Sequence, residues 1–304
     1  MHFCRALLSI QILATLSVLP WSAQALASRN EHRPVCSPDG SQMAYMLKSE
    51  RTRDDWELYR LDIESQVHSR LTFHQGWDGY AVWSPDGSRI VYDREDQPGE
   101  PKRPWVMQMA DLTTRPLGSY EGWLSISDWT PDNRLLGFYE KDGQRDLVML
   151  DLEGNIIESI TTTDHSSEHD AHFSPDGKLI AFASGDSDGN ETSLEIIERA
   201  SGERRVLRTS IGRIYGIDWS PDGREIAFVD APEGDDDDAD IFLYNIADES
   251  TRQITDDPAW DHMPEFCNSA HILLYTSYRS GEERIYRIDP DPQPFLTITR
   301  PAEP

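Results

Sequence analysis

A five-residue motif recurs along the chain and limits its fold more than any other feature. Residues 83–87 and 219–223 read Trp-Ser-Pro-Asp-Gly, and close variants stand at residues 36–40, 129–132 and 173–177. Pro fixes φ at the second position of a tight turn, Asp accepts hydrogen bonds from nearby backbone, and Gly supplies a positive φ. Strand-like residues flank each copy, so each motif is predicted to be the tip of a β-hairpin.

The spacing of the motif predicts the architecture. Its first, mostly aromatic position is held by Cys36, Trp83, Trp129, Phe173, Trp219 and, in a degenerate sixth copy, Phe266. The intervals are 47, 46, 44, 46 and 47 residues, and each repeat contains four strand-like segments. A four-stranded antiparallel unit repeated six times is typical of a propeller. We therefore expect an all-β protein, a six-bladed β-propeller of four-stranded antiparallel blades, with the aromatic residue packed between neighbouring blades.

The six repeats fill the chain after its first 27 residues, which leaves no room for a second domain. The expected blades are approximately residues 30–74, 75–120, 121–163, 164–210, 211–257 and 258–301, within a single propeller spanning residues 28–304.

The repeats resemble those of a known family. The segments WSPDGREIAFVD, WSPDGSRIVYD and FSPDGKLIAFAS look like the blade repeat of TolB-type six-bladed propellers, and the resemblance covers nearly all of residues 30–300. It implies the fold, and also a role in binding a protein or peptide at the mouth of the channel. Two departures are expected: there is no room for the N-terminal domain of TolB, and no G-x-S-x-G motif supports a serine peptidase.

The first 27 residues have the composition of a secretory signal peptide. One Arg precedes an apolar stretch from Ala6 to Leu19, and A-x-A sites end at Ala25 and Ala27. No later stretch is apolar enough to span a bilayer. We expect a periplasmic or secreted protein without an integral membrane segment in its mature form. Its net charge of −27 excludes nucleic acid as a partner, because phosphates would be repelled.

Cysteine content fits an exported protein. Cys4 lies in the leader, so Cys36 and Cys267 would remain in a compartment that permits disulfides. They stand in the first and last blades, which are neighbours in a closed ring. A disulfide between them is one hypothesis. The alternative is two buried thiols whose side chains point to opposite faces of their strands.

Acidic residues and histidines recur at the start of the innermost strand. Five residues before the aromatic position stand Glu31, Asp78, Glu168 and Asp261, and the next position holds His32, His169 and His262, with Tyr215 in the fifth blade. Because the innermost strand borders the axis, these residues and Arg213 are expected to surround one mouth of the channel. The alternative is that the acids cap the turns between blades and the histidines pack locally.

A divalent metal ion is the one cofactor these residues suggest. His165, His169, His172 and His262 are its candidate ligands, since imidazole and carboxylate bind Zn²⁺ or Mn²⁺. The segment HDAHFSPDG is also similar to the His-before-FSP pattern of oligogalacturonate lyases, which are TolB-like propellers with His ligands in the channel. Two functions follow as expectations: a non-catalytic binding module of the cell envelope with a protein or peptide partner, or a metal-dependent carbohydrate-active enzyme. A sensor or maturation factor is a variant of the first.

Overall fold

The structure is a computed structural model, and it describes residues 30–48, 56–73, 76–97, 99–163, 166–186, 192–231, 238–256, 258–267, 272–288 and 296–297. The predicted signal peptide at residues 1–27 lies outside this described part, as do Asp164 and His165.

Twenty-four β-strands account for the regular structure of the described residues. Blade 1 contains β1 (Glu31–Cys36), β2 (Gln42–Lys48), β3 (Trp56–Asp62) and β4 (His68–Arg70). Blade 2 contains β5 (Asp78–Trp83), β6 (Arg89–Arg94), β7 (Arg103–Gln108) and β8 (Thr114–Pro116). Blade 3 contains β9 (Trp123–Trp129), β10 (Leu135–Lys141), β11 (Gln144–Leu150) and β12 (Ile156–Ser159). Blade 4 contains β13 (Ser166–Phe173), β14 (Leu179–Asp186), β15 (Thr192–Glu198) and β16 (Arg204–Ser210). Blade 5 contains β17 (Arg213–Trp219), β18 (Glu225–Ala231), β19 (Asp240–Asn245) and β20 (Thr251–Gln253). Blade 6 contains β21 (Asp261–Cys267), β22 (Ile272–Ser277), β23 (Arg284–Ile288) and β24 (Leu296–Thr297).

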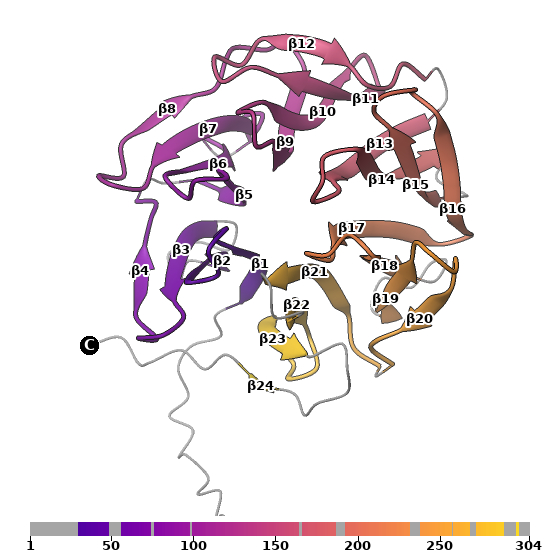
Figure 1. Cartoon of the computed structure of the whole chain (residues 1–304). Helices are drawn as coiled ribbons and strands as arrows, with labels where there is room; N and C mark the ends of the chain where they lie inside the picture. The colour runs from indigo at the N-terminus through magenta and orange to yellow at the C-terminus, as the bar shows by residue number, and fades with distance from the viewer. Residues whose placement is uncertain are drawn as a thin grey trace, which may run out of the picture.

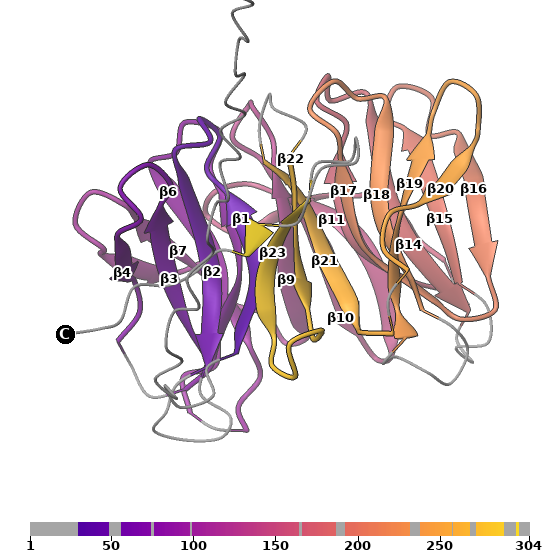
Figure 2. The same ribbon diagram turned by 90° about the horizontal axis from the view of Figure 1, so that it is seen from below.

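The blades form a ring with the first strand of each blade on the inside (Figure 1). Within a blade each strand pairs antiparallel with the next, and a single parallel pair, Arg145 with Ser167, links blade 3 to blade 4. Seen from the side, the molecule is a disc in which the strands run between two faces (Figure 2). The predicted all-β, six-bladed propeller of four-stranded antiparallel blades is confirmed. Among the described residues, no helix has the length and apolar character needed to cross a membrane.

The recurring motif forms the predicted turn between the first and second strands. In blade 2, Asp86 Oδ1 accepts hydrogen bonds from the hydroxyls of Ser84 and Ser88, at 2.6 and 2.7 Å, and from the backbone N–H of Ser88. Gly87 has φ of +68°, which a residue with a Cβ rarely adopts. The hydrogen bonds to Ser84 and Ser88 lower the pKa of the Asp86 carboxyl to about 2.

Hydrophobic side chains gather between blades. Each of six buried clusters contains residues from two neighbouring blades, and the sixth joins Met43 and Tyr45 of blade 1 to Leu274 and Ile285 of blade 6. Trp83, Trp129 and Trp219 are buried in these contacts, as the spacing predicts. One sheet alone would leave both of its faces in water, so closure of the ring supplies much of the hydrophobic stabilisation.

Candidate functional site

A cavity of about 290 Å³ is lined by the innermost strands of all six blades. Its wall includes Arg33, Asp128, Asp170, His172, Asp218 and Glu265, together with Pro38, Pro85 and Pro131 from the motif turns. The cavity therefore occupies the central channel and extends toward the face that carries these turns. The nine residues predicted to surround the mouth do not line it: Glu31, His32, Asp78, Glu168, His169, Arg213, Tyr215, Asp261 and His262.

A β-bulge redirects the innermost strand in five blades. Three residues before the aromatic position, Arg33, Tyr80, Asp170, Gly216 and Met263 all have a left-handed backbone, with φ between +48° and +61°. The register of the first strand against the second shifts at each of these points. A bulge adds one residue to one strand and so changes the face to which the following side chains point. Left-handed non-glycine residues are costly and often mark functional sites.

Three acids just before the aromatic position project into the cavity and bridge neighbouring blades. Asp128 Oδ2 accepts the backbone N–H of Phe173 at 2.7 Å, and Asp218 Oδ2 accepts that of Phe266 at 2.6 Å. Glu265 Oε1 accepts the backbone N–H of Cys36 at 3.2 Å. In each case the donor is the residue at the aromatic position of the next blade around the ring.

Burial perturbs all three of these carboxyls. It raises the pKa of Asp128 to about 6 and that of Asp218 to about 7. For Glu265, burial and then the neighbouring charge of Asp218 raise the pKa well above its ordinary value. Removing a carboxylate from water disfavours its charged form, and a like charge nearby adds to the effect. A cation entering the channel would offset both the desolvation of these carboxylates and their mutual repulsion.

Arg33 is the one Lys or Arg among the described residues that line the cavity. Its guanidinium lies over the ring of Tyr80, with Cζ 4.4 Å from the ring centroid. Burial would raise the pKa of Asp170, but the charges of His169 and Arg33 and the N–H of Gly216 together lower it. Burial lowers the pKa of His172 to about 4, so this imidazole is neutral at neutral pH.

The acids predicted to surround the mouth lie inside the blades instead. Glu168, Asp261 and Asp78 are fully buried, and Glu31 is nearly so. Arg204 Nη1 lies 3.2 Å from Glu168 Oε1, and Arg279 Nη2 lies 2.7 Å from Asp261 Oδ2. The structure thus favours the alternative, in which these acids are local anchors at the start of the innermost strand in blades 1, 2, 4 and 6. The physical reason is the bulge, which places these acids and the channel residues on different faces of one strand.

The predicted metal ligands do not meet at one point. His169 and His172 lie on β13 of blade 4, two blades away from His262, and His165 is outside the described residues. Among the described residues, the one set of three or more possible ligands comprises His32, His262 and Glu283. Glu283 was not predicted, because it lies outside the innermost strand, where the acids and histidines recur from blade to blade.

The two remaining predicted mouth residues have different surroundings. Arg213 is exposed, and its Cζ lies 5.3 Å from the centroid of the Tyr215 ring. Tyr215 is buried in the contact between blades 5 and 6, where its hydroxyl accepts a hydrogen bond from Trp260 Nε1 at 2.8 Å. Tyr215 is therefore a packing residue.

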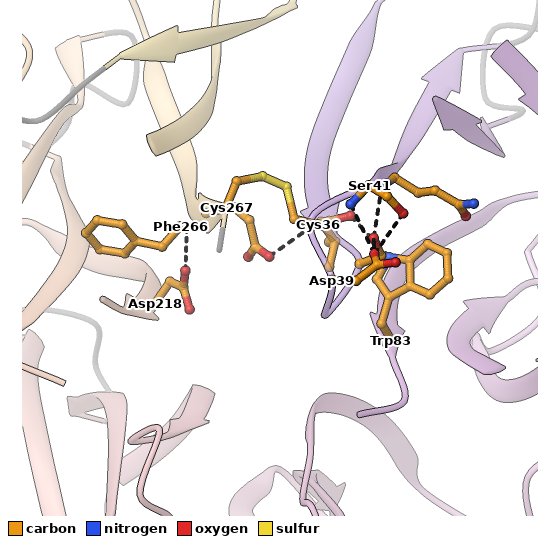
Figure 3. Close-up of a disulfide and its surroundings, with 11 residues drawn as sticks. Cys36, Asp39, Ser41, Trp83, Asp218, Phe266 and Cys267 are labelled. Atoms are coloured by element: carbon orange, nitrogen blue, oxygen red, sulfur yellow. Dashed lines mark hydrogen bonds between the residues drawn. A yellow bond between two sulfur atoms is a disulfide. The ribbon is translucent and has the colours of Figure 1, made fainter. Parts of the chain in front are cut away.

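The ring closes where blade 6 meets blade 1 (Figure 3). The structure has a disulfide between Cys36 on β1 and Cys267 on β21, with their Cα atoms 5.4 Å apart. This separation lies in the range that disulfides adopt. Nearby, the backbone N–H groups of Glu31 and Arg33 donate to Glu283 O and to Thr276 Oγ1, both at 3.0 Å.

The channel residues had a signal in the sequence that was not used. An acid stands directly before the aromatic position in blades 3, 5 and 6, in the segments SDW, IDW and PEF. A charged residue beside a core aromatic must find a polar partner or a polar cavity. The bulge residues Arg33 and Tyr80 had no such signal, because the bulge position holds a different type of residue in each of the five blades.

Comparison with known proteins supports the same fold. A family model described as TolB beta propeller domain matches residues 12–189. An uncharacterized protein of Agrobacterium fabrum is 27% identical over 218 residues, which cover 67% of this chain and 71% of that protein. Dipeptidyl-peptidase 5 of Porphyromonas gingivalis is 25% identical over 150 residues, covering 44% of this chain but 21% of that enzyme.

Solved structures with the same fold have different functions. A putative TolB from Agrobacterium tumefaciens superposes with a TM-score of 0.67 at 21% identity, covering 79% of this chain and 86% of that one. TolB from Acinetobacter baumannii has a TM-score of 0.65 at 17% identity, and the match covers 87% of this chain and 61% of that one. An oligogalacturonate lyase from Vibrio parahaemolyticus has a TM-score of 0.58 at 17% identity, and the match covers 86% of this chain and 77% of the lyase. Likeness at these identities establishes the fold and leaves the function to the site.

Proposed function

The chain belongs to the TolB β-propeller family, and on that premise we propose that it is an exported, non-catalytic binding protein of the cell envelope. Its central channel would receive a basic segment of a protein or peptide partner. The observation that carries this proposal is the excess of acid in the channel: Asp128, Asp170, Asp218 and Glu265 against a single Arg33.

The electrostatics favour a cationic ligand. Asp128, Asp218 and Glu265 are buried, and their raised pKa values reflect the cost of holding negative charge away from water. A Lys or Arg side chain inserted between them would offset that cost through charge-assisted hydrogen bonds. The net charge of −27 on the whole chain would also speed the approach of a basic partner.

Two observations support export. Residues 1–27 have the composition of a signal peptide. The disulfide between Cys36 and Cys267 would persist in an oxidising compartment such as the periplasm or the extracellular space.

The test is a binding titration with two peptides of equal length, one rich in Lys and Arg and the other rich in Asp and Glu. We expect the basic peptide alone to bind, with an affinity that falls as salt is added. The double variant Asp128→Asn/Asp218→Asn removes two charges but keeps one acceptor oxygen on each side chain for the N–H of the next blade, so it should fold and bind the basic peptide less tightly. Equal binding of both peptides, or unchanged binding by the double variant, would refute the proposal.

A metal-dependent carbohydrate lyase is the second candidate. It is favoured by the set His32, His262 and Glu283, and by an oligogalacturonate lyase in complex with manganese among the structural neighbours, at 16% identity and a TM-score of 0.55. However, oligogalacturonate is a polyanion, and the acids of the channel would repel it. Release of unsaturated sugar from oligogalacturonate by the purified protein with Mn²⁺ would reverse this order of preference.

A further inference from the structure

His262, at the contact between blades 6 and 1, is a buried histidine with unusual surroundings. Its side chain is fully buried, and neither Nδ1 nor Nε2 has a hydrogen-bond partner among the described residues. The ring of Trp260 stacks on it, with centroids 3.9 Å apart and an angle of 5° between the planes. Packing therefore fixes the orientation of the imidazole. A buried polar group without a hydrogen-bond partner destabilises the folded state, and a bound ligand would remove that cost.

Two further ligand groups lie beside this ring. The ring of His32 on β1 has its centroid 4.9 Å from that of His262. His32 Nδ1 is also buried without a hydrogen-bond partner among the described residues, and it lies 3.6 Å from Glu283 Oε1. The side chains of His32 and Glu283 are only 15% and 10% exposed. One donor atom from each of the three residues lies within 4.8 Å of the other two.

We propose that His32, His262 and Glu283 bind one divalent metal ion of the zinc type between the first and last blades. Two imidazole nitrogens and one carboxylate oxygen are donors that zinc accepts, and three protein ligands leave its fourth position for water. Donors at about 2.1 Å from a tetrahedral ion lie about 3.4 Å apart. The distance of 3.6 Å between His32 and Glu283 is already close to this value.

The surroundings select these three residues as ligands over the acids beside them. Asp261 and Glu31 precede the two histidines directly, but Arg279 lies 2.7 Å from Asp261 and Arg284 lies 3.8 Å from Glu31. These arginines neutralise the neighbouring acids, whereas Glu283 points at His32.

The metal would have a structural role that is separate from the channel. Its ligands come from β1, β21 and the segment just before β23, so one ion would join the two blades that no connecting loop links. It would act beside the disulfide of Cys36 and Cys267 as a second cross-link of the ring. Because an ion that binds only the folded state stabilises it, metal removal should lower the thermal midpoint.

The experiment is a Zn²⁺ titration of the purified, untagged chain after chelator treatment, with Co²⁺ as a spectroscopic substitute. We expect one equivalent of Zn²⁺ per chain, a visible absorption band for bound Co²⁺, and a higher thermal midpoint in the presence of metal. Glu283→Gln is nearly isosteric and should weaken binding at least about 100-fold, since loss of a second-shell group alone costs 10–100-fold. His169→Ala serves as the control, because His169 holds the same repeat position in blade 4 but belongs to no such set of ligands among the described residues.

The proposal is overturned if the wild-type chain takes up no stoichiometric metal, if Glu283→Gln and His32→Gln bind as tightly as the wild type, or if His169→Ala loses the metal equally. Should a variant at the fully buried His262 fail to fold, Glu283→Gln still decides the matter. Peptide binding in the channel is measured independently, so failure of one proposal leaves the other standing.

Discussion

Asp218 on β17 accepts the backbone N–H of Phe266 on β21, in the next blade, at 2.6 Å (Figure 3). The same hydrogen bond joins Asp128 to Phe173 and Glu265 to Cys36, so these carboxylates of the channel also link neighbouring blades. In blades 1 and 4 the position before the aromatic residue is not acidic, and an indole of the next blade makes the link instead. Trp83 Nε1 donates to Val35 O at 3.2 Å, and Trp219 Nε1 donates to His172 O at 3.0 Å. Channel chemistry and ring stability therefore depend on the same residues.

The contribution of Asp218 to the stability of the protein should fall as the pH rises from about 4 to 7. Its pKa is raised from 3.8 to about 7, so the folded state binds more protons than the unfolded state within this window. This carboxyl therefore lowers the free energy of unfolding as the pH increases. Asp218→Asn keeps one oxygen that accepts the N–H of Phe266, and the amide cannot ionise. The free energy of unfolding should therefore fall less, or rise more, with pH in this variant than in the wild type. Urea unfolding at pH 5 and pH 8 measures it.

Asp176→Asn provides the control for this comparison. The pKa of Asp176 is lowered to about 2 by hydrogen bonds from Lys178 and Ser174, so its carboxyl is ionised in both states between pH 5 and 8. The variant should have the wild-type slope. An unchanged slope in Asp218→Asn would mean that this carboxyl titrates normally in the folded protein.

The buried tryptophans should differ in the cost of replacement by Phe. Trp83, Trp129 and Trp219 hold the same repeat position and are buried to a similar extent. The indole N–H of Trp83 and Trp219 is hydrogen-bonded, but that of Trp129 has no partner among the described residues. Trp83→Phe and Trp219→Phe should therefore cost about 1–2 kcal/mol more than Trp129→Phe in the free energy of unfolding. A cost for Trp129→Phe equal to the others would contradict this account.

The fold could be predicted from the sequence because each repeat specifies its own local structure. Turn residues such as Pro85, Asp86 and Gly87 determine the hairpin, and the aromatic residue before them marks the contact between blades. Six copies at nearly constant spacing then leave a closed ring as the arrangement in which every sheet is covered on both faces.

The site could not be located in the same way. Side chains alternate along a regular strand, so residues five and one before the aromatic position, such as Glu168 and His172, should share a face. The bulge at Asp170 lies between them and breaks this rule, because it adds a residue that sequence alternation does not reveal. His172 therefore lines the channel, whereas Glu168 is buried against Arg204. Glu283 was missed because it lies outside the innermost strand.

Loss of the disulfide should destabilise the ring. Cys36 and Cys267 are 231 residues apart in sequence, and the chain-entropy model gives about 5 kcal/mol for a loop of this length. We expect the double variant Cys36→Ser/Cys267→Ser to unfold at lower temperature and to be insensitive to reductant, whereas reductant should lower the midpoint of the wild type. Peptide mapping without reduction should recover the two cysteines in one linked fragment. Two free thiols in that map would refute the disulfide.

Affinity of the channel for a basic peptide should increase as the pH rises from about 5 to 8. The carboxyls of Asp128 and Asp218 have pKa values raised to about 6 and about 7, so a large fraction of them is protonated at the lower pH. A cation binds their ionised form, and binding therefore releases protons in this window. Calorimetry in two buffers of different ionisation enthalpy would count the released protons directly. In Asp128→Asn/Asp218→Asn both the pH dependence and the proton release should diminish. Affinity that falls with pH, or proton uptake on binding, would instead place the ligand on groups such as Arg33 that attract anions.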